Sequence, residues 1–257
     1  MDHFLLNLSL TGVVLLLFAV MLTGALIEWL VRRYIWRVHF RGGGDVANYI
    51  AMLTVFFGLL LGLMAVDLWQ KQDAAQANTI NEASQIRILY SLSNFLPGDR
   101  RPFVNALGDY TQSVIMKEWP SMLRDHSTVL FIASPELDMV RNTLFQLEPQ
   151  NSAQSAIFQQ ALTCYASIVA ERHQRLIDAE DAVPGLLWLT LAVGAGFIWV
   201  TTWFIAFDST ATQFTMSSIT VGYMFLLIYL IVILEHPFLG VWRVDATPYQ
   251  HVLQILH

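Results

Sequence analysis

Three carboxylates near the ends of long apolar segments are the residues best placed to do chemistry, namely Glu28, Asp67 and Glu235. Ionisable groups inside a membrane commonly mark ion pathways or proton relays. Each of the three lies close to a segment end, so an interfacial position in reach of water explains it without a special role. His173 lies in a stretch of mixed charge, residues 171–175, which is typical of a solvated or subunit-facing helix surface.

Catalytic and metal-binding motifs are missing from the sequence. It contains no glycine-rich phosphate loop, no HExxH, no GxSxG and no pair of histidines at ligand spacing. The one cysteine, Cys164, excludes an intrachain disulfide and a cysteine metal cage. A net charge of −6 gives no reason to expect nucleic acid. We therefore predict a protein that is not an enzyme, with no cofactor, no metal and no nucleic-acid partner.

The composition places the chain in a membrane. Its 257 residues are 55% hydrophobic and 13% charged, whereas soluble domains carry about 25% charged residues. Four apolar segments are long enough to cross about 30 Å of hydrocarbon: residues 8–31, 49–69, 185–207 and 214–234. The first is long and lacks a basic leader and a cleavage site, so we expect a retained span. We predict an all-α integral membrane protein with four transmembrane helices in two hairpins.

A helical domain is predicted between the second and third spans. The second span continues without a breaker as an amphipathic helix as far as Pro97-Gly98. Farther on, Ser134-Pro135-Glu136 is a strong helix start. The predicted organisation is a first transmembrane hairpin, a helical bundle domain, a second transmembrane hairpin and a tail with a short amphipathic helix, over residues 1–69, 70–184, 185–234 and 235–257 respectively.

Four arginines follow the first span, at Arg32, Arg33, Arg37 and Arg41. Charge sorting predicts that the loop of residues 32–48 is cytoplasmic. A second interpretation is a site for an anion or a lipid head group. The lipid bilayer is a partner under either interpretation.

The second span carries two kinds of face. Gly58 and Gly62 form a small-residue stripe suited to close helix packing. Phe56 or Phe57, with Leu60 and Met64, forms a bulky stripe. If several copies surrounded an axis, that stripe would be a hydrophobic constriction. Ordinary contact with lipid or another helix explains the same spacing.

An ordered set of short motifs extends along nearly the whole chain. Its members are Ala65-x-x-x-Trp69, Glu82-Ala83-Ser84, Leu96-Pro97, Asp109-Tyr110, Val114, Glu118-Trp119-Pro120, Arg172-x-x-Arg175-Leu176, Val183-Pro184, Leu187-Trp188 and Glu235-His236-Pro237-Phe238-x-Gly240. No single motif is specific, but the ordered set is hard to obtain by chance, and it resembles a bacterial family called bestrophin-like.

The resemblance implies a bestrophin-like fold and an analogy to bestrophins, which are pentameric chloride-permeable channels. In them the second membrane helix lines a narrow neck. Carried over, this implies a homo-oligomer, a pentamer if the analogy holds, that passes inorganic anions across the bacterial inner membrane. The neck candidates, and so the predicted pore-lining residues, are Phe56, Phe57, Leu60 and Met64.

Three departures from bestrophins bear on this analogy. Of the acidic calcium clasp after the fourth span, only Glu235 and Asp245 remain. The second span lacks a proline-bracketed phenylalanine run. The bestrophin helical domain is cytoplasmic, whereas the arginine loop here predicts the opposite side.

The leading functional hypothesis is an oligomeric ion channel, anion-permeable, whose second spans line the pore. The alternative is a non-conducting membrane scaffold or sensor whose central helical domain binds a partner or ligand. A membrane enzyme or proton-coupled carrier comes third, because it would need Glu28, Asp67 or His173 to converge on a cavity at mid-membrane.

Overall fold

A computed structural model describes residues 8–34, 44–122, 134–180, 183–204, 209–240 and 242–256. The elements within these ranges are all helical, which confirms the all-α prediction. Of the residues singled out above, Arg37 and Arg41 lie outside the described residues. The helices are α2 (Leu10–Tyr34), α3 (Gly44–Ser93), α4 (Arg101–Ser113), the π-helix η1 (Val114–Glu118), α5 (Trp119–Met122), α6 (Pro135–Leu144), α7 (Ser152–Glu180), α8 (Gly185–Thr202), α9 (Thr210–Glu235) and α10 (Thr247–Leu256).

The chain divides into two compact units. The membrane unit comprises residues 1–70, 182–235 and 240–242, and the helical domain comprises residues 71–181, 236–239 and 243–257. The 50-residue helix α3 contributes to both. Its continuity follows from the sequence, since neither glycine nor proline interrupts the chain between Gly62 and Pro97.

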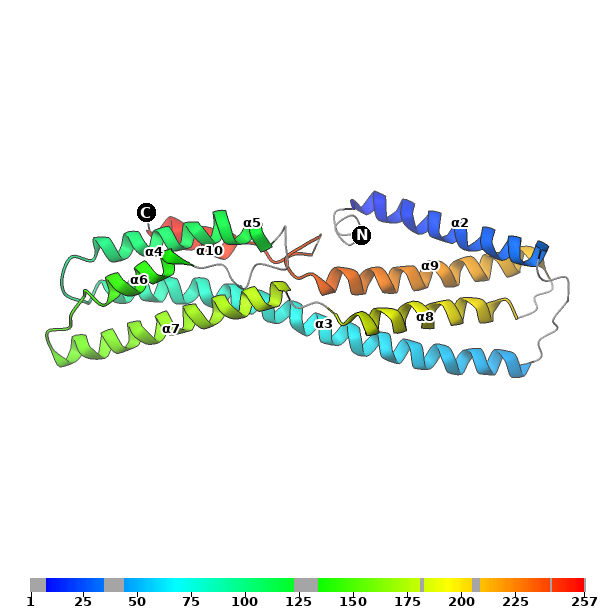
Figure 1. The fold of residues 1–257 in the computed structure, drawn as a ribbon, viewed down its shortest axis with the longest axis horizontal. Helices are drawn as coiled ribbons and strands as arrows, with labels where there is room; N and C mark the ends of the chain where they lie inside the picture. The colour runs from blue at the N-terminus through cyan, green and yellow to red at the C-terminus, as the bar shows by residue number, and fades with distance from the viewer. Residues whose placement is uncertain are drawn as a thin grey trace. The chain divides into compact units, whose positions relative to one another are not determined.

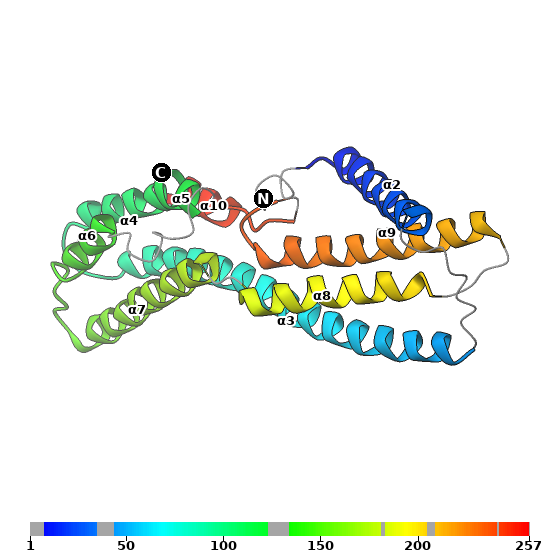
Figure 2. The same ribbon diagram turned by 45° about the vertical axis from the view of Figure 1, so that its right-hand side comes forward.

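Four described helices are long and apolar enough to span a bilayer: α2, residues 48–93 of α3, α8 and α9. Within the membrane unit, α9 packs against both α2 and α8 (Figure 1). The first half of α3 joins them through Phe57, Leu61, Met64 and Leu68, which share a core with α8 and α9 (Figure 2). The outward faces remain apolar and exposed, as expected for helices surrounded by lipid or by other copies.

Glycines set the closest helix approaches in the membrane unit. A Cβ on Gly194 of α8 would stand 2.7 Å from the ring of Phe57, and one on Gly222 of α9 would stand 2.9 Å from Met21 of α2. On α2, Gly24 faces Val221 in the same way, at 3.2 Å. Small residues at these points let the helices approach closely enough for dispersion contacts to hold them in lipid.

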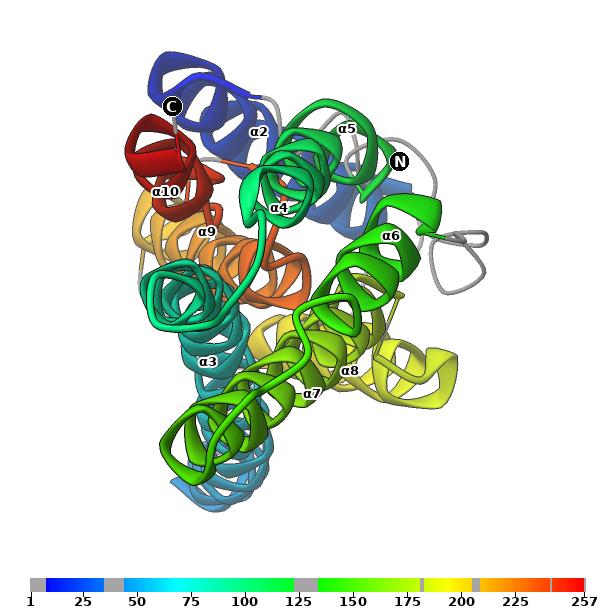
Figure 3. The same cartoon turned by 90° about the vertical axis from the view of Figure 1, so that its left-hand side faces the viewer.

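The helical domain has its own core. There α4 packs against α6, and α10 packs against α4 and η1 (Figure 3). The predicted helix start at Ser134 is confirmed, because its hydroxyl accepts a hydrogen bond from Leu137 N at 3.3 Å. The long helix α3 is followed by buried Leu96 and by Gly98, whose φ of +93° lies in the left-handed region that glycine tolerates.

Candidate functional site

The spanning half of α3 has one face inside the chain and one outside it. Its buried face repeats every three to four residues through Phe57, Leu61, Met64 and Leu68. Roughly opposite lie exposed apolar residues, Phe56, Leu59, Leu63 and Val66. The exposed face is therefore left for lipid, for a neighbouring copy or for a pore.

The four pore-lining candidates divide between these faces. Phe56 is 59% exposed, so it is placed to meet something outside the chain, whereas Leu60 is partly buried and packs against the edge of the chain's own core. Phe57 and Met64 instead pack against α8 and α9 of the same chain. The physical reason is local, since the absence of a side chain at Gly194 leaves the space that the Phe57 ring occupies.

The small-residue stripe has no partner within the described chain. Gly58 and Gly62 have no atom within 4 Å of the point where a Cβ would stand. Packing at these glycines therefore needs a partner outside the chain, and their predicted packing role stays a prediction.

The three carboxylates found by sequence occupy different environments. Asp67 is exposed, as expected for an interfacial residue. Glu28 was expected to reach water, but its side chain is fully buried between α2 and α9. The reason is packing, because Gln213 of α9 and Arg32 of α2 both donate hydrogen bonds to its Oε1, at 3.2 and 3.0 Å. Of the four arginines that follow the first predicted span, Arg32 and Arg33 lie in the last turn of α2.

Glu235 is the last residue of α9, and its side chain links this helix to the start of α8. Its Oε1 accepts hydrogen bonds from Val183 N at 2.9 Å and from the indole Nε1 of Trp188 at 3.3 Å. One carboxylate oxygen thus satisfies a main-chain N–H and an indole N–H that are both partly buried. These contacts give Glu235 a structural role in closing the α8–α9 pair.

A buried ionic network lies at the centre of the helical domain. The guanidinium of Arg175 donates to Glu82 from Nε at 2.9 Å and from Nη2 at 3.3 Å, and to Glu118 from Nη2 at 2.8 Å. Arg172, one helical turn earlier on α7, donates to the other oxygen of Glu118 at 2.8 Å. The two arginines and two glutamates balance in charge, which is how burial of charge is tolerated.

Aromatic side chains enclose this network. The guanidinium of Arg175 lies 5.6 Å from the ring centroids of both Trp119 and Tyr249, within cation–π range. The hydroxyl of Tyr110 donates to Glu82 at 2.6 Å. Burial and the nearby carboxylates raise the pKa of Tyr110 well above its ordinary value, so its hydroxyl stays a proton donor. Burial alone would lower the pKa of Arg175, but Glu82, Tyr249 and Glu118 reverse this and raise it.

The π-helix η1 positions Glu118 in the network. Trp119 N–H bonds to the carbonyl of Val114, five residues back, which inserts one extra residue into the turn. Directly after this turn, Trp119 packs edge-on against Phe238 and Tyr249. Such π-bulges are frequent at functional sites.

Sequence reasoning did not assign the network, although its members were in view. Glu82, Tyr110, Glu118, Arg172 and Arg175 all belong to the motifs that carried the resemblance. Their partners are distant in sequence, so no local pattern pairs them. The available signal was charged residues at positions that should face a helical core.

The network lacks the arrangement of an active site. Both arginines and both glutamates are engaged in ion pairs, which leaves no poised nucleophile beside a base. In the described part of the chain, no group of three or more His, Cys, Asp or Glu side chains is placed to hold a metal. The arrangement is suited to fixing the packing of α3, α4, η1 and α7.

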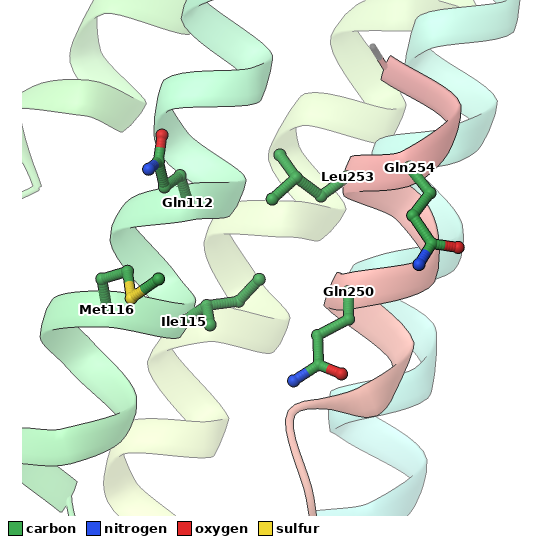
Figure 4. A pocket seen from close by; sticks show the side chains of 6 residues that line it. All are labelled: Gln112, Ile115, Met116, Gln250, Leu253 and Gln254. Atoms are coloured by element: carbon green, nitrogen blue, oxygen red, sulfur yellow. The ribbon is translucent and has the colours of Figure 1, made fainter.

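A shallow groove of about 550 Å³ lies on the surface of the helical domain, between α10 and the α4–η1 segment. Figure 4 shows its lining, in which apolar side chains alternate with amides: Gln112, Ile115, Met116, Gln250, Leu253 and Gln254. Amides with apolar neighbours suit an uncharged or weakly polar partner.

The spans, the helical domain and the polar clusters define a multi-pass helical membrane protein. A family model described as a Bestrophin-like domain matches residues 17–249, so the chain belongs to the Bestrophin-like family. This confirms the family resemblance seen in the ordered motifs. No curated protein matches the chain.

Solved structures share the fold. Two variants of a bacterial bestrophin homologue from Klebsiella pneumoniae align with TM-scores of 0.71 and 0.72, each at 14% identity. The alignments cover 95% of this chain and 97% and 98% of theirs. A structure described as a membrane protein aligns with a TM-score of 0.70 at 14% identity, over 96% of this chain and 98% of its own. At this identity the likeness shows the fold.

Proposed function

We propose that the protein is an oligomeric, anion-permeable ion channel of the bacterial inner membrane, with the spanning halves of α3 around the pore. The observation that carries the proposal is the exposed apolar face of α3, which no described helix of the chain covers. Membership of the Bestrophin-like family supports it, because bestrophins line their neck with the second membrane helix.

The burial pattern narrows the pore-lining set within this proposal. Phe56 and Leu63 project outward at helical spacing, and Leu60 lies between this face and the inner core. Phe57 and Met64 stand behind them, where they hold α3 against α8 and α9. The neck is thus formed by the outer residues and supported by the inner ones.

The oligomer follows from the same geometry. One α3 leaves its outward face to lipid, and only several copies around an axis form a constriction. We infer a homo-oligomer, five copies by analogy with bestrophins. Native mass spectrometry of the detergent-solubilised protein measures the copy number, and a monomer would exclude this pore.

Conduction is tested with purified protein in planar bilayers. Phe56→Ala should change the single-channel current, because it widens the proposed constriction. The matched control is Phe197→Ala on α8, where a phenylalanine is 65% exposed against 59% for Phe56. Absence of current in the wild type, or equal currents in the two variants, would contradict the proposed pore.

Anion permeability is a separate measurement. In a potassium chloride gradient, the reversal potential should lie toward the chloride equilibrium potential. A reversal potential at the potassium equilibrium potential would reject the anion assignment while leaving the channel intact.

A non-conducting sensor is the second candidate, and the groove beside α10 is the observation that favours it. Under this function, Met116→Lys would charge an exposed groove residue and weaken partner capture without changing the fold. Met139→Lys on α6 is the matched control, since this methionine is also exposed but lies outside the groove.

A further inference from the structure

The most unusual polar group in the membrane unit is the carboxylate of Glu28. Its side chain is 0% exposed, and its two carboxylate oxygens differ in their hydrogen bonds. Oε1 accepts from Arg32 and from Gln213, whereas the buried Oε2 accepts from no group among the described residues. A buried carboxylate oxygen without a donor is costly, and such groups require an explanation.

A second unpartnered group lies on the neighbouring helix. Ser217 is 1% exposed, and its buried hydroxyl has no hydrogen-bond partner in the part of the chain that the structure describes. It lies one turn after Gln213 on the buried face of α9, and Gln213 touches Glu28 directly. The contact of Gly24 with Val221, one turn farther along both antiparallel helices, puts Ser217 level with Glu28 across the seam.

Among the described residues, few other charged or polar groups face this seam. Arg32, on the same helix as Glu28, supplies the charge that balances it and also donates from Nη2 to the Trp203 carbonyl at 3.2 Å. From α9 come Gln213 and Ser217, and Gln213 also donates to the Thr202 carbonyl of α8 at 3.1 Å. The side chain of Arg32 is 38% exposed, so it keeps contact with solvent or head groups when Glu28 loses its charge.

We propose that Glu28 is a proton-binding site between α2 and α9, with the proton carried on Oε2. The proton comes from the aqueous phase and forms an O–H bond to Oε2, which changes the charge of the Glu28–Arg32 pair from zero to +1. Oε1 keeps both of its donors. The new hydroxyl can donate to the Ser217 oxygen through one bridging water, because the two atoms are not directly hydrogen-bonded in the structure.

The chemistry favours a proton over a metal ion in this seam. Arg32 already occupies one side of the carboxylate with a positive charge, which opposes a second cation held at full charge. A proton instead removes the charge of Glu28 and converts an unsatisfied acceptor into a donor. This inference does not depend on whether the protein conducts ions.

Infrared difference spectroscopy across a pH step tests the site, because it detects the C=O stretch of a protonated buried carboxyl. The wild type should show such a band, Glu28→Gln should lose it, and Asp67→Asn should keep it. Asp67 is the matched control, as an exposed carboxylate in the same unit. Glu28→Gln keeps an oxygen acceptor for Arg32 and Gln213, so we expect it to fold, with circular dichroism as the check.

Ser217→Ala gives an independent readout in a protein with an intact Glu28–Arg32 pair. Removing the acceptor should weaken proton binding, so the band should be smaller than in the wild type after the same pH step. The band should also shift in frequency. A spectrum unchanged in both Glu28→Gln and Ser217→Ala, or the absence of any protonated band while the protein stays folded, would overturn the proposal.

Discussion

Arg175 and Glu82 form an ion pair in which both side chains are entirely buried, with Nε and Oε2 2.9 Å apart. They are 93 residues apart in sequence, on α7 and α3. A buried pair contributes little net stability compared with an apolar pair, but removing one partner leaves a charge without compensation. The network therefore acts mainly as a constraint on how α7 and α3 pack within the helical domain.

Arg175→Met should lower the free energy of unfolding of the helical domain by about 3–5 kcal/mol, because Glu82 and Glu118 would remain buried without their shared cation. Denaturant unfolding followed by circular dichroism measures the change. Arg101→Gln is the control, since it breaks an exposed pair with Asp99 and should have no measurable effect. Equal stabilities of the two variants would show that the network carries no constraint.

Alkaline pH should destabilise the helical domain. Burial and neighbouring carboxylates raise the pKa of Tyr110, and burial also raises that of Tyr249, in the folded protein above the unfolded value of about 10. The folded state then holds protons that the unfolded state releases, so stability is full below pH 10 and falls as the pH rises further.

Tyrosinate absorbance during an alkaline titration tests this expectation. The two buried tyrosines, Tyr110 and Tyr249, should ionise only together with loss of helical structure. In Tyr249→Phe the fall in stability should be shallower. Complete ionisation of all tyrosines in the folded protein would refute it.

Gly194→Ala should destabilise the membrane unit by about 1–3 kcal/mol, because its Cβ would collide with the ring of Phe57. Gly58→Ala is the matched control, a glycine-to-alanine change in a spanning helix with open space around it. Thermal unfolding in detergent compares them. Loss of oligomers in Gly58→Ala, with the protomer intact, would show that this glycine packs against another copy.

Glu235→Ala should cost about 1–3 kcal/mol, because Val183 N and the Trp188 indole both lose their acceptor. Glu235→Gln should recover much of this, since an amide oxygen can accept the same bonds. The midpoint of thermal unfolding distinguishes the two variants. If the glutamine variant were as unstable as the alanine variant, the charge of Glu235 rather than its hydrogen bonds would matter.

Features that depend on local pattern were predicted well from sequence. Apolar length located the spans, and Ser134 with Pro135 located the start of α6. The unbroken run after Gly62 predicted that the second span continues into the helical domain, as α3 does. In each case the physical cause lies within a few residues of the feature.

Features that depend on distant partners were not predicted. The spacing of the second span left Phe56 and Phe57 as alternatives in its bulky stripe, and only Gly194 of α8 shows that Phe57 lies on the inner face. Glu28 was predicted to be interfacial from its place near the end of a span, but Gln213 of α9 covers it and donates a hydrogen bond to it. Charge and hydropathy say where a residue can lie, but they do not say which helix will cover it.

The single π turn at Val114–Glu118 makes the number of residues in this segment as important as their identity. Deleting one residue between Tyr110 and Val114 would restore an ordinary α-helical turn and rotate Glu118 by about 100° relative to Tyr110. Glu118 would then point away from Arg175, although every charged residue would still be present. An alignment of related chains that scores only substitutions would miss this defect, because it would appear as a gap of one residue.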